Sequence, residues 1–154
     1  MQITYATWNV HRAVGQDERR DPTRIVDAIE TALVPEWPDI LARQEADAEC
    51  PPNVSIIDVD RVSRLTGLAH QNDSDDLRCG PQSDGFFCGT ILWADPRFER
   101  SRADVIDLVG HRHRCAVSVE LNDYSTPFHI IFGHFSFSQP LRVVQMWIIG
   151  QYIR

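Results

Sequence analysis

The chain of 154 residues contains no lysine, no long apolar run and no pair of closely spaced cysteines. All fifteen basic residues are arginine, which we attribute to coding bias, although a forked guanidinium also suits phosphate oxygens better than an ammonium does. No apolar run approaches the roughly 20 residues of a membrane-spanning helix, and no basic segment followed by an apolar stretch indicates a signal peptide. These absences predict a cytoplasmic protein without a membrane span.

The cysteine spacing and the charge narrow the class further. The four cysteines lack C-x-x-C spacing, which favours reduced thiols over a disulfide framework. The formal net charge of −7 provides no broad basic field, and this argues against tight, sequence-independent binding to duplex nucleic acid. Small or locally held phosphate esters remain compatible with this charge, and the length suits a single domain.

The apolar pattern predicts a mixed α/β domain. A first strand ends in Asn9, a helix begins at Asp21 and Pro22 with an N-cap residue followed by proline, and a second strand ends in Glu45. The later elements that we expect are a helix over 55–65 that closes near Gly67, an exposed loop over 70–85, four strands over 86–94, 103–108, 115–121 and 128–137, and a helix over 140–154. Short apolar or alternating runs separated by turn residues predict that the four strands follow one another in an antiparallel sheet.

Asn9 and Glu45 each follow an apolar run, and one helix-length interval separates the two runs. This order predicts that an amide and a carboxylate meet at one edge of a sheet. A glutamate in such a place is a natural Mg²⁺ ligand, because Mg²⁺ takes oxygen donors and accepts one or two carboxylates while keeping several waters.

Five short motifs carry a resemblance to a known family, and they occur along the chain in the order Trp8-Asn9-Val10-His11, Gln44-Glu45, Gly89-Thr90-Ile91-Leu92, Arg114-Cys115-Ala116 and Gly133-His134-Phe135-Ser136. Together they resemble the N-terminal half of the endonuclease/exonuclease/phosphatase superfamily, the DNase I-like metal-dependent phosphoesterases. The resemblance covers essentially the whole chain and implies a four-layer α/β sandwich with mainly antiparallel sheets. Arg43 stands where the family has leucine, and Gly133 stands where the family has threonine.

The resemblance also implies roles for four residues. Glu45 would bind Mg²⁺ or Mn²⁺, Asn9 would help to organise the metal and the phosphate, and His134 would donate hydrogen bonds to phosphoryl oxygens. Arg114 would add a forked donor to phosphate. Each residue also has a structural interpretation: a strand-end amide for Asn9, solvated charges for Glu45 and Arg114, and a core histidine for His134.

A different metal site is conceivable at His111, His113 and Cys115, because residues that alternate along a strand share one face. Three ligands on one strand are poorly placed for a tetrahedron, and no C-x-x-C pair supports them. We therefore do not favour a zinc or copper site there.

Two segments of the family's active site do not occur in the sequence, namely Gly-Asp-x-Asn and Ser-Asp-His. In the family they supply a second acidic metal contact, the carboxylate that orients water, and the histidine that transfers a proton. We therefore expect residues 1–154 to form a single domain that lacks the C-terminal half of the family domain. Such a domain would leave apolar sheet surface open to self-association or to a partner.

The sequence thus predicts a metal-dependent phosphoester hydrolase of the nuclease or phosphatase type, with part of its active site missing. Its substrate would be a phosphate ester, including nucleic acid as one possibility. The alternatives are a non-catalytic module of the same fold that binds phosphate or a partner, and a purely structural subunit.

Overall fold

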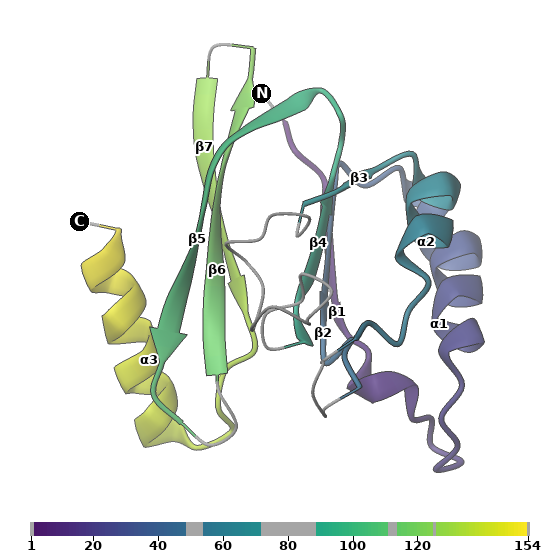
Figure 1. Cartoon of the computed structure of the whole chain (residues 1–154), viewed down its shortest axis with the longest axis horizontal. Helices are drawn as coiled ribbons and strands as arrows, with labels where there is room; N and C mark the ends of the chain where they lie inside the picture. The colour runs from purple at the N-terminus through teal and green to yellow at the C-terminus, as the bar shows by residue number, and fades with distance from the viewer. Residues whose placement is uncertain (1, 49–53, 72–88, 111–113, 125, 154) are drawn as a thin grey trace.

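A computed structural model describes residues 2–48, 54–71, 89–110, 114–124 and 126–153. Two sheets pack face to face, helices α1 and α2 cover the outer face of one sheet, and α3 covers the outer face of the other (Figure 1). The elements are β1 Tyr5–Asn9, α1 Pro22–Ala28, β2 Ile40–Gln44, α2 Val59–Thr66, β3 Ala69–His70, β4 Ile91–Ala94, β5 Phe98–Leu108, β6 Arg114–Asp123, β7 Thr126–Gly133 and α3 Gln139–Tyr152. The predicted four-layer α/β sandwich with mainly antiparallel sheets is confirmed.

The first sheet has the order β1-β2-β4-β3. Strand β1 runs parallel to β2 and pairs Asn9 with Gln44, so the two strands end at the same edge of the sheet. Strand β4 pairs with β2 in the antiparallel sense. This corrects the prediction that β4 continues into one sheet with the next three strands, because β4 pairs with a strand that lies about 50 residues earlier.

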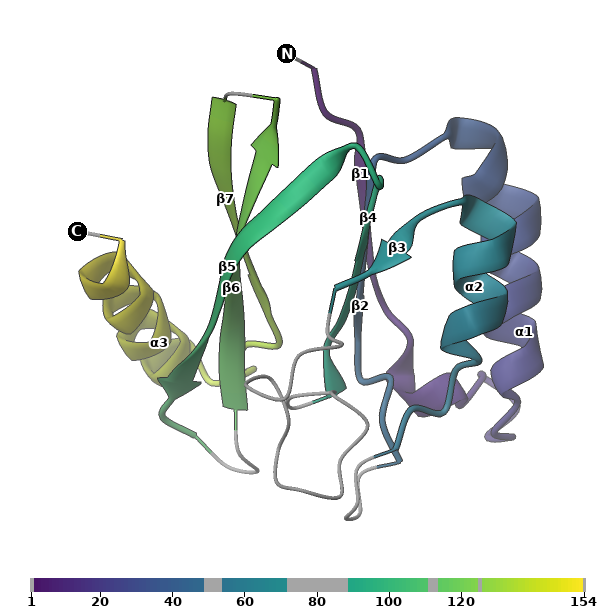
Figure 2. The ribbon, with the colours of Figure 1, turned by 45° about the horizontal axis from the view of Figure 1, so that its top comes forward.

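The second sheet consists of β5, β6 and β7 in antiparallel succession, as predicted for these three strands. Strand β5 begins at Phe98 and is longer than expected, and β7 ends at Gly133 rather than at Phe137. His134 therefore lies just beyond its strand. Figure 2 shows the segment that leads from β7 to α3.

Helix α1 begins as predicted, since the Asp21 side chain accepts a hydrogen bond from the Thr23 amide and Pro22 occupies the first position. Helix α2 starts later than the expected residue 55, because the cap is Asp58, whose carboxylate accepts from the Arg61 amide. It ends as predicted at Gly67, which has a left-handed conformation with φ of 74°. Of the loop expected over 70–85, residues 72–85 lie outside the described residues, and His70 belongs to β3 instead.

Three apolar clusters hold the layers together. The first lies between the helices α1 and α2 and the first sheet, and includes Ile29, Leu41 and Trp93. The second joins the two sheets, and the third packs Ile149 of α3 on the second sheet. None of the helices in the described ranges combines the length and the apolar character needed to cross a membrane.

Candidate functional site

The Glu45 carboxylate is the centre of the candidate site. Glu45 directly follows β2, and its side chain is only 11% exposed. Its Oε1 lies 3.3 Å from Nε2 of His134, which follows β7 in the other sheet and is 16% exposed. The structure thus brings together two of the four predicted site residues, one from each of the two sheets.

Two residues of the turn that follows β1, His11 and Arg12, also contact this carboxylate. Nδ1 of His11 lies 3.3 Å from Glu45 Oε2, and Nη1 of Arg12 lies 3.7 Å from the same oxygen. His11 is 77% exposed whereas Arg12 is 25% exposed, so Arg12 reaches inward and His11 borders the solvent. Glu45 is therefore surrounded by nitrogen groups that can carry positive charge, rather than solvated at the surface.

An unusual backbone turn places these two residues. His11, Arg12 and Ala13 have φ of 48°, 49° and 58°, and Glu45 itself has φ of 53°. Left-handed conformations cost residues other than glycine about 1–2 kcal/mol each. Hydrogen bonds hold the turn: the Arg12 amide donates to the Glu45 carbonyl at 2.9 Å, and the Ala13 amide donates to the Val10 carbonyl at 2.8 Å.

Asn9 lies close to Glu45 because its backbone pairs with Gln44, the residue before Glu45, in the neighbouring strand. Its side-chain Oδ1 accepts a hydrogen bond from the His11 amide at 2.9 Å. This contact starts the left-handed turn. Asn9 therefore has the structural role of a strand-end amide, which is the alternative that the sequence offers for this residue. Its predicted role toward metal and phosphate stays a prediction.

Asp47 is a further acidic residue near Glu45 that the sequence interpretation did not select. It is 7% exposed, and its Oδ1 lies 3.7 Å from Nε of Arg12. Arg12 thus contacts two nearly buried carboxylates. One signal in the sequence pointed to it: Glu45 and Asp47 are separated by a single residue and follow the buried strand β2.

Arg114 is placed only through its backbone, at the beginning of β6. Since Ala116 pairs with Gly133, Arg114 lies at the end of the sheet from which the chain continues to His134. Its predicted contact with phosphate stays a prediction.

The alternative metal site falls mostly outside the described residues, because it includes His111 and His113. Its third member, Cys115, is buried in β6. In the described ranges, no three acidic, histidine or cysteine side chains converge as a complete set of protein ligands would.

Arg43 precedes the Gln44-Glu45 motif and is fully buried in β2. Its guanidinium lies 5.1 Å from the centre of the Trp8 ring, and Nη1 donates to the Ala42 carbonyl at 3.2 Å. Burial lowers the pKa of Arg43 to about 10. The Arg43 side chain therefore packs against the strand that carries Asn9, where the resembling family has an apolar leucine.

Helix α3 supports the segment after His134. The fully buried Gln145 accepts a hydrogen bond from the Ser136 amide at 2.9 Å and donates to the Val109 carbonyl at 2.7 Å. A histidine in a free loop would be poorly positioned, whereas this amide ties the segment to the end of β5.

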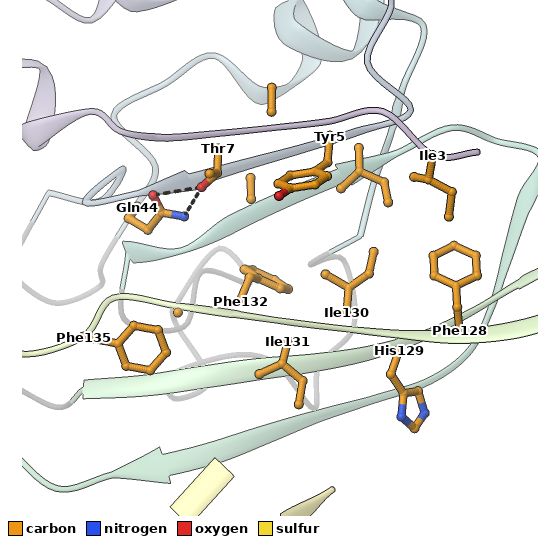
Figure 3. A pocket seen from close by; sticks show the side chains of 14 residues that line it. Ile3, Tyr5, Thr7, Gln44, Phe128, His129, Ile130, Ile131, Phe132 and Phe135 are labelled. Atoms are coloured by element: carbon orange, nitrogen blue, oxygen red, sulfur yellow. Dashed lines mark hydrogen bonds between the residues drawn. The ribbon is translucent and has the colours of Figure 1, made fainter. Parts of the chain in front are cut away.

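A largely apolar cavity of about 600 Å³ lies between β1 and β7 (Figure 3). Ile3 and Phe128 lie at one end, and Gln44 and Phe135 lie at the other, next to Glu45 and His134 in the chain. The Gln44 side-chain amide donates to the Thr7 hydroxyl at 3.1 Å on the wall of this cavity.

Solved structures of known proteins share this architecture. Truncated TDP2 from Caenorhabditis elegans matches 97% of the chain at 15% identity, with a TM-score of 0.66. An endonuclease/exonuclease/phosphatase from Beutenbergia cavernae matches 99% of the chain at 19% identity, with a TM-score of 0.61. The chain has the endonuclease/exonuclease/phosphatase fold. TDP2 from D. rerio in complex with a single-strand DNA product matches 98% of the chain at 14% identity, with a TM-score of 0.65.

The chain spans 53%, 44% and 54% of these three proteins, which is about half of their length. No family model and no curated protein matches the chain by sequence. The comparisons therefore establish the endonuclease/exonuclease/phosphatase fold, and the chemistry has to be argued from the residues.

The donor set of the site is compatible with the Mg²⁺ or Mn²⁺ that the resemblance implies. Glu45 offers a nearly buried carboxylate, and Asp47 Oδ1 is buried without a hydrogen-bond donor in the described part of the chain. A hard cation takes oxygen ligands of this kind, and Mg²⁺ needs only one or two carboxylates because waters and substrate complete its shell.

Proposed function

We propose that the chain contributes to a metal-dependent phosphoester hydrolase, with Glu45 as a ligand of Mg²⁺ or Mn²⁺. The observation that carries this proposal is the Glu45–His134 contact of 3.3 Å between nearly buried side chains from the two sheets. The left-handed turn after β1 and the ends of β2 and β7 all meet at Glu45. An ion pair that only stabilises the fold does not need three segments to meet in this way.

The bound metal would stabilise the negative charge that gathers on phosphoryl oxygens. In this proposal His134 donates a hydrogen bond to one of those oxygens from its position beside Glu45. In the same proposal Arg114, at the beginning of β6, and Asn9, at the end of β1, act on the same phosphate. Donors that are held in place before the reaction stabilise the transition state without reorganisation.

The substrate class in this proposal is a phosphate ester, and single-stranded nucleic acid is one candidate. Nucleic acid is a candidate because the chain is structurally similar to a TDP2 that was solved with a single-strand DNA product. The identity between the two sequences is 14%, so the similarity establishes the fold alone. The net charge of −7 favours a small ester instead. The cytoplasmic location stays a prediction from the sequence.

The test is hydrolysis of bis-p-nitrophenyl phosphate, single-stranded DNA and plasmid DNA with Mg²⁺ or Mn²⁺. We expect metal-dependent turnover that Glu45→Ala abolishes, and that His134→Ala lowers by about 100- to 1000-fold, as for the loss of one oxyanion donor. His129→Ala is the matched control, because His129 is a histidine of β7 that pairs with Glu120 and not with Glu45.

A folded chain that binds metal or phosphate without turnover would contradict the hydrolase proposal and favour a non-catalytic binding module. The observation that favours this second candidate is the largely apolar cavity between β1 and β7, which a bound partner would cover. A chain with neither affinity nor turnover would indicate a structural subunit.

A further inference from the structure

Arg12 lies between two carboxylates that are almost removed from solvent. Its Nη1 is 3.7 Å from Glu45 Oε2 and its Nε is 3.7 Å from Asp47 Oδ1. The two side chains are 11% and 10% exposed. We propose that Asp47 is a second carboxylate ligand of the divalent cation, and that Arg12 competes with that cation for both carboxylates. This inference rests on the proposed function of Glu45.

The burial of Asp47 argues for such a role. Its Oδ1 has no hydrogen-bond donor in the described ranges, and the Arg12 Nε at 3.7 Å is too distant to be one. A buried charged oxygen without a hydrogen bond costs free energy, because its lost hydration is not replaced. A cation ligated by this oxygen would replace that hydration directly.

The backbone around Asp47 is fixed on both sides. The Ala46 amide donates to the Gly89 carbonyl at 2.8 Å, and Asp47 forms a bridge with Ser55. At Gly89, which has φ of 70°, an added Cβ would lie 2.6 Å from Asp47 Oδ1. The glycine therefore leaves the space that the carboxylate occupies, and the paired backbone on both sides fixes the position of Asp47.

Arg12 is equally fixed, because its amide donates to the Glu45 carbonyl within the left-handed turn. Its contacts of 3.7 Å are longer than the 2.7–2.9 Å typical of charge-assisted hydrogen bonds. A guanidinium at this distance neutralises the charge of both carboxylates but does not form the close hydrogen bonds that would resist its replacement by a cation. A divalent cation can therefore replace the interaction, and two carboxylates are within the number that Mg²⁺ accepts.

The experiment measures Mn²⁺ binding to the whole chain by electron paramagnetic resonance and calorimetry, without any substrate. We expect Asp47→Asn and Glu45→Gln each to weaken Mn²⁺ binding at least about tenfold, since even residues outside the ligand shell cost 10- to 100-fold. Arg12→Gln is expected to tighten binding several-fold, because it removes the competing charge.

Asp39→Asn is the matched control. Asp39 is also a largely buried carboxylate paired with an arginine, with 2.6 Å to Arg97, but it precedes the opposite end of β2. This variant should bind Mn²⁺ as the wild type does.

Loss of binding in Glu45→Gln with unchanged binding in Asp47→Asn and Arg12→Gln would overturn the inference and leave the proposed function intact. A wild-type chain that binds no Mn²⁺ would overturn both. If Asp47→Asn does not fold, as judged by near-UV circular dichroism, Arg12→Gln decides: tighter binding supports the competition, and unchanged binding refutes it.

Discussion

At the scale of single residues, Gly133 is closely surrounded by the neighbouring strand β6. An added Cβ at Gly133 would lie 2.8 Å from the Cys115 carbonyl and 3.1 Å from the Cα and Cβ of Ala116. Strand β7 therefore approaches β6 closely just before His134. This contact gives a physical reason for glycine where the resembling family has threonine, because any side chain would push His134 away from Glu45.

We expect Gly133→Ala to lower the free energy of unfolding by about 1–3 kcal/mol, as overpacking usually does. It should also reduce any activity that depends on His134. Gly150→Ala serves as the control: Gly150 lies in α3 with no atom within 4 Å of an added Cβ, so alanine should stabilise the helix by about 0.5–1 kcal/mol. Urea unfolding of both variants measures the difference, and an equal effect of the two substitutions would contradict the steric account.

The resemblance selected Glu45 and His134 as site residues from the order of short motifs, and the structure brings their side chains together. Their chemical roles stay predictions. The sequence did not predict Arg12 and Asp47 as neighbours of Glu45. Their contact depends on left-handed residues in two separate segments, and no residue type in those segments demands that conformation. The sequence shows which side chains these segments carry, but it does not show the left-handed backbone conformation that brings them together.

At the scale of elements, the end of α3 is anchored to the second sheet by a polar contact. The Tyr152 hydroxyl donates to Asp104 Oδ2, and Nε of Arg102 lies 2.6 Å from the same oxygen. The hydrogen bond from Tyr152, and next the one from Arg102, hold the pKa of Asp104 below its ordinary value of 3.8. The pKa of Tyr152 is raised, first by burial and then by the hydrogen bond to Asp104.

The sign of these shifts gives a pH dependence. A carboxyl whose pKa is lowered by folding stabilises the native state above its unfolded pKa, and this stability is lost as the pH falls through the folded pKa. We therefore expect acid to weaken α3 docking below about pH 4, and Tyr152→Phe to show a smaller loss between pH 6 and pH 3.

Urea unfolding of wild type and Tyr152→Phe across that range measures this effect. Tyr124→Phe is the control, because Tyr124 is 96% exposed. Parallel profiles for wild type and Tyr152→Phe would contradict the anchoring role of Asp104.

The helices and strands themselves were largely predictable, because caps and apolar periods are local signals. Asp21 predicted the beginning of α1 and Gly67 predicted the end of α2, and both residues have these positions in the structure. The partner of β4 was not predictable, since its pairing with β2 joins segments about 50 residues apart and depends on the packing of both sheets. The early end of β7 likewise follows from the turn toward α3 and not from its apolar residues.

At the scale of the whole molecule, β1 and β7 are edge strands of the two described sheets and flank the apolar cavity. Tyr5 on β1 is 73% exposed, and β1 carries no charged residue. Edge strands of stable monomers are usually protected by charge, proline or a bulge, because their free backbone groups pair readily with another chain.

We expect the 154-residue chain to associate as its concentration rises, with an increase in sedimentation coefficient between about 10 and 200 μM; edge pairing is the physical reason. Tyr5→Lys should suppress this association by placing a charge on the edge of β1. Tyr124→Lys is the control, because Tyr124 is also exposed but lies on the turn between β6 and β7 rather than on β1. A wild-type chain that stays monomeric over the whole range would refute this expectation.

The position of the site residues along the chain also orders events during synthesis. Arg12, Glu45 and Asp47 belong to the first third of the sequence, and His134 follows Glu45 by about 90 residues. At about 5–20 residues per second, a ribosome needs about 4–18 seconds to cover that interval. The two carboxylates are therefore made with their arginine, and their charge can be compensated locally before the strand that delivers the histidine exists.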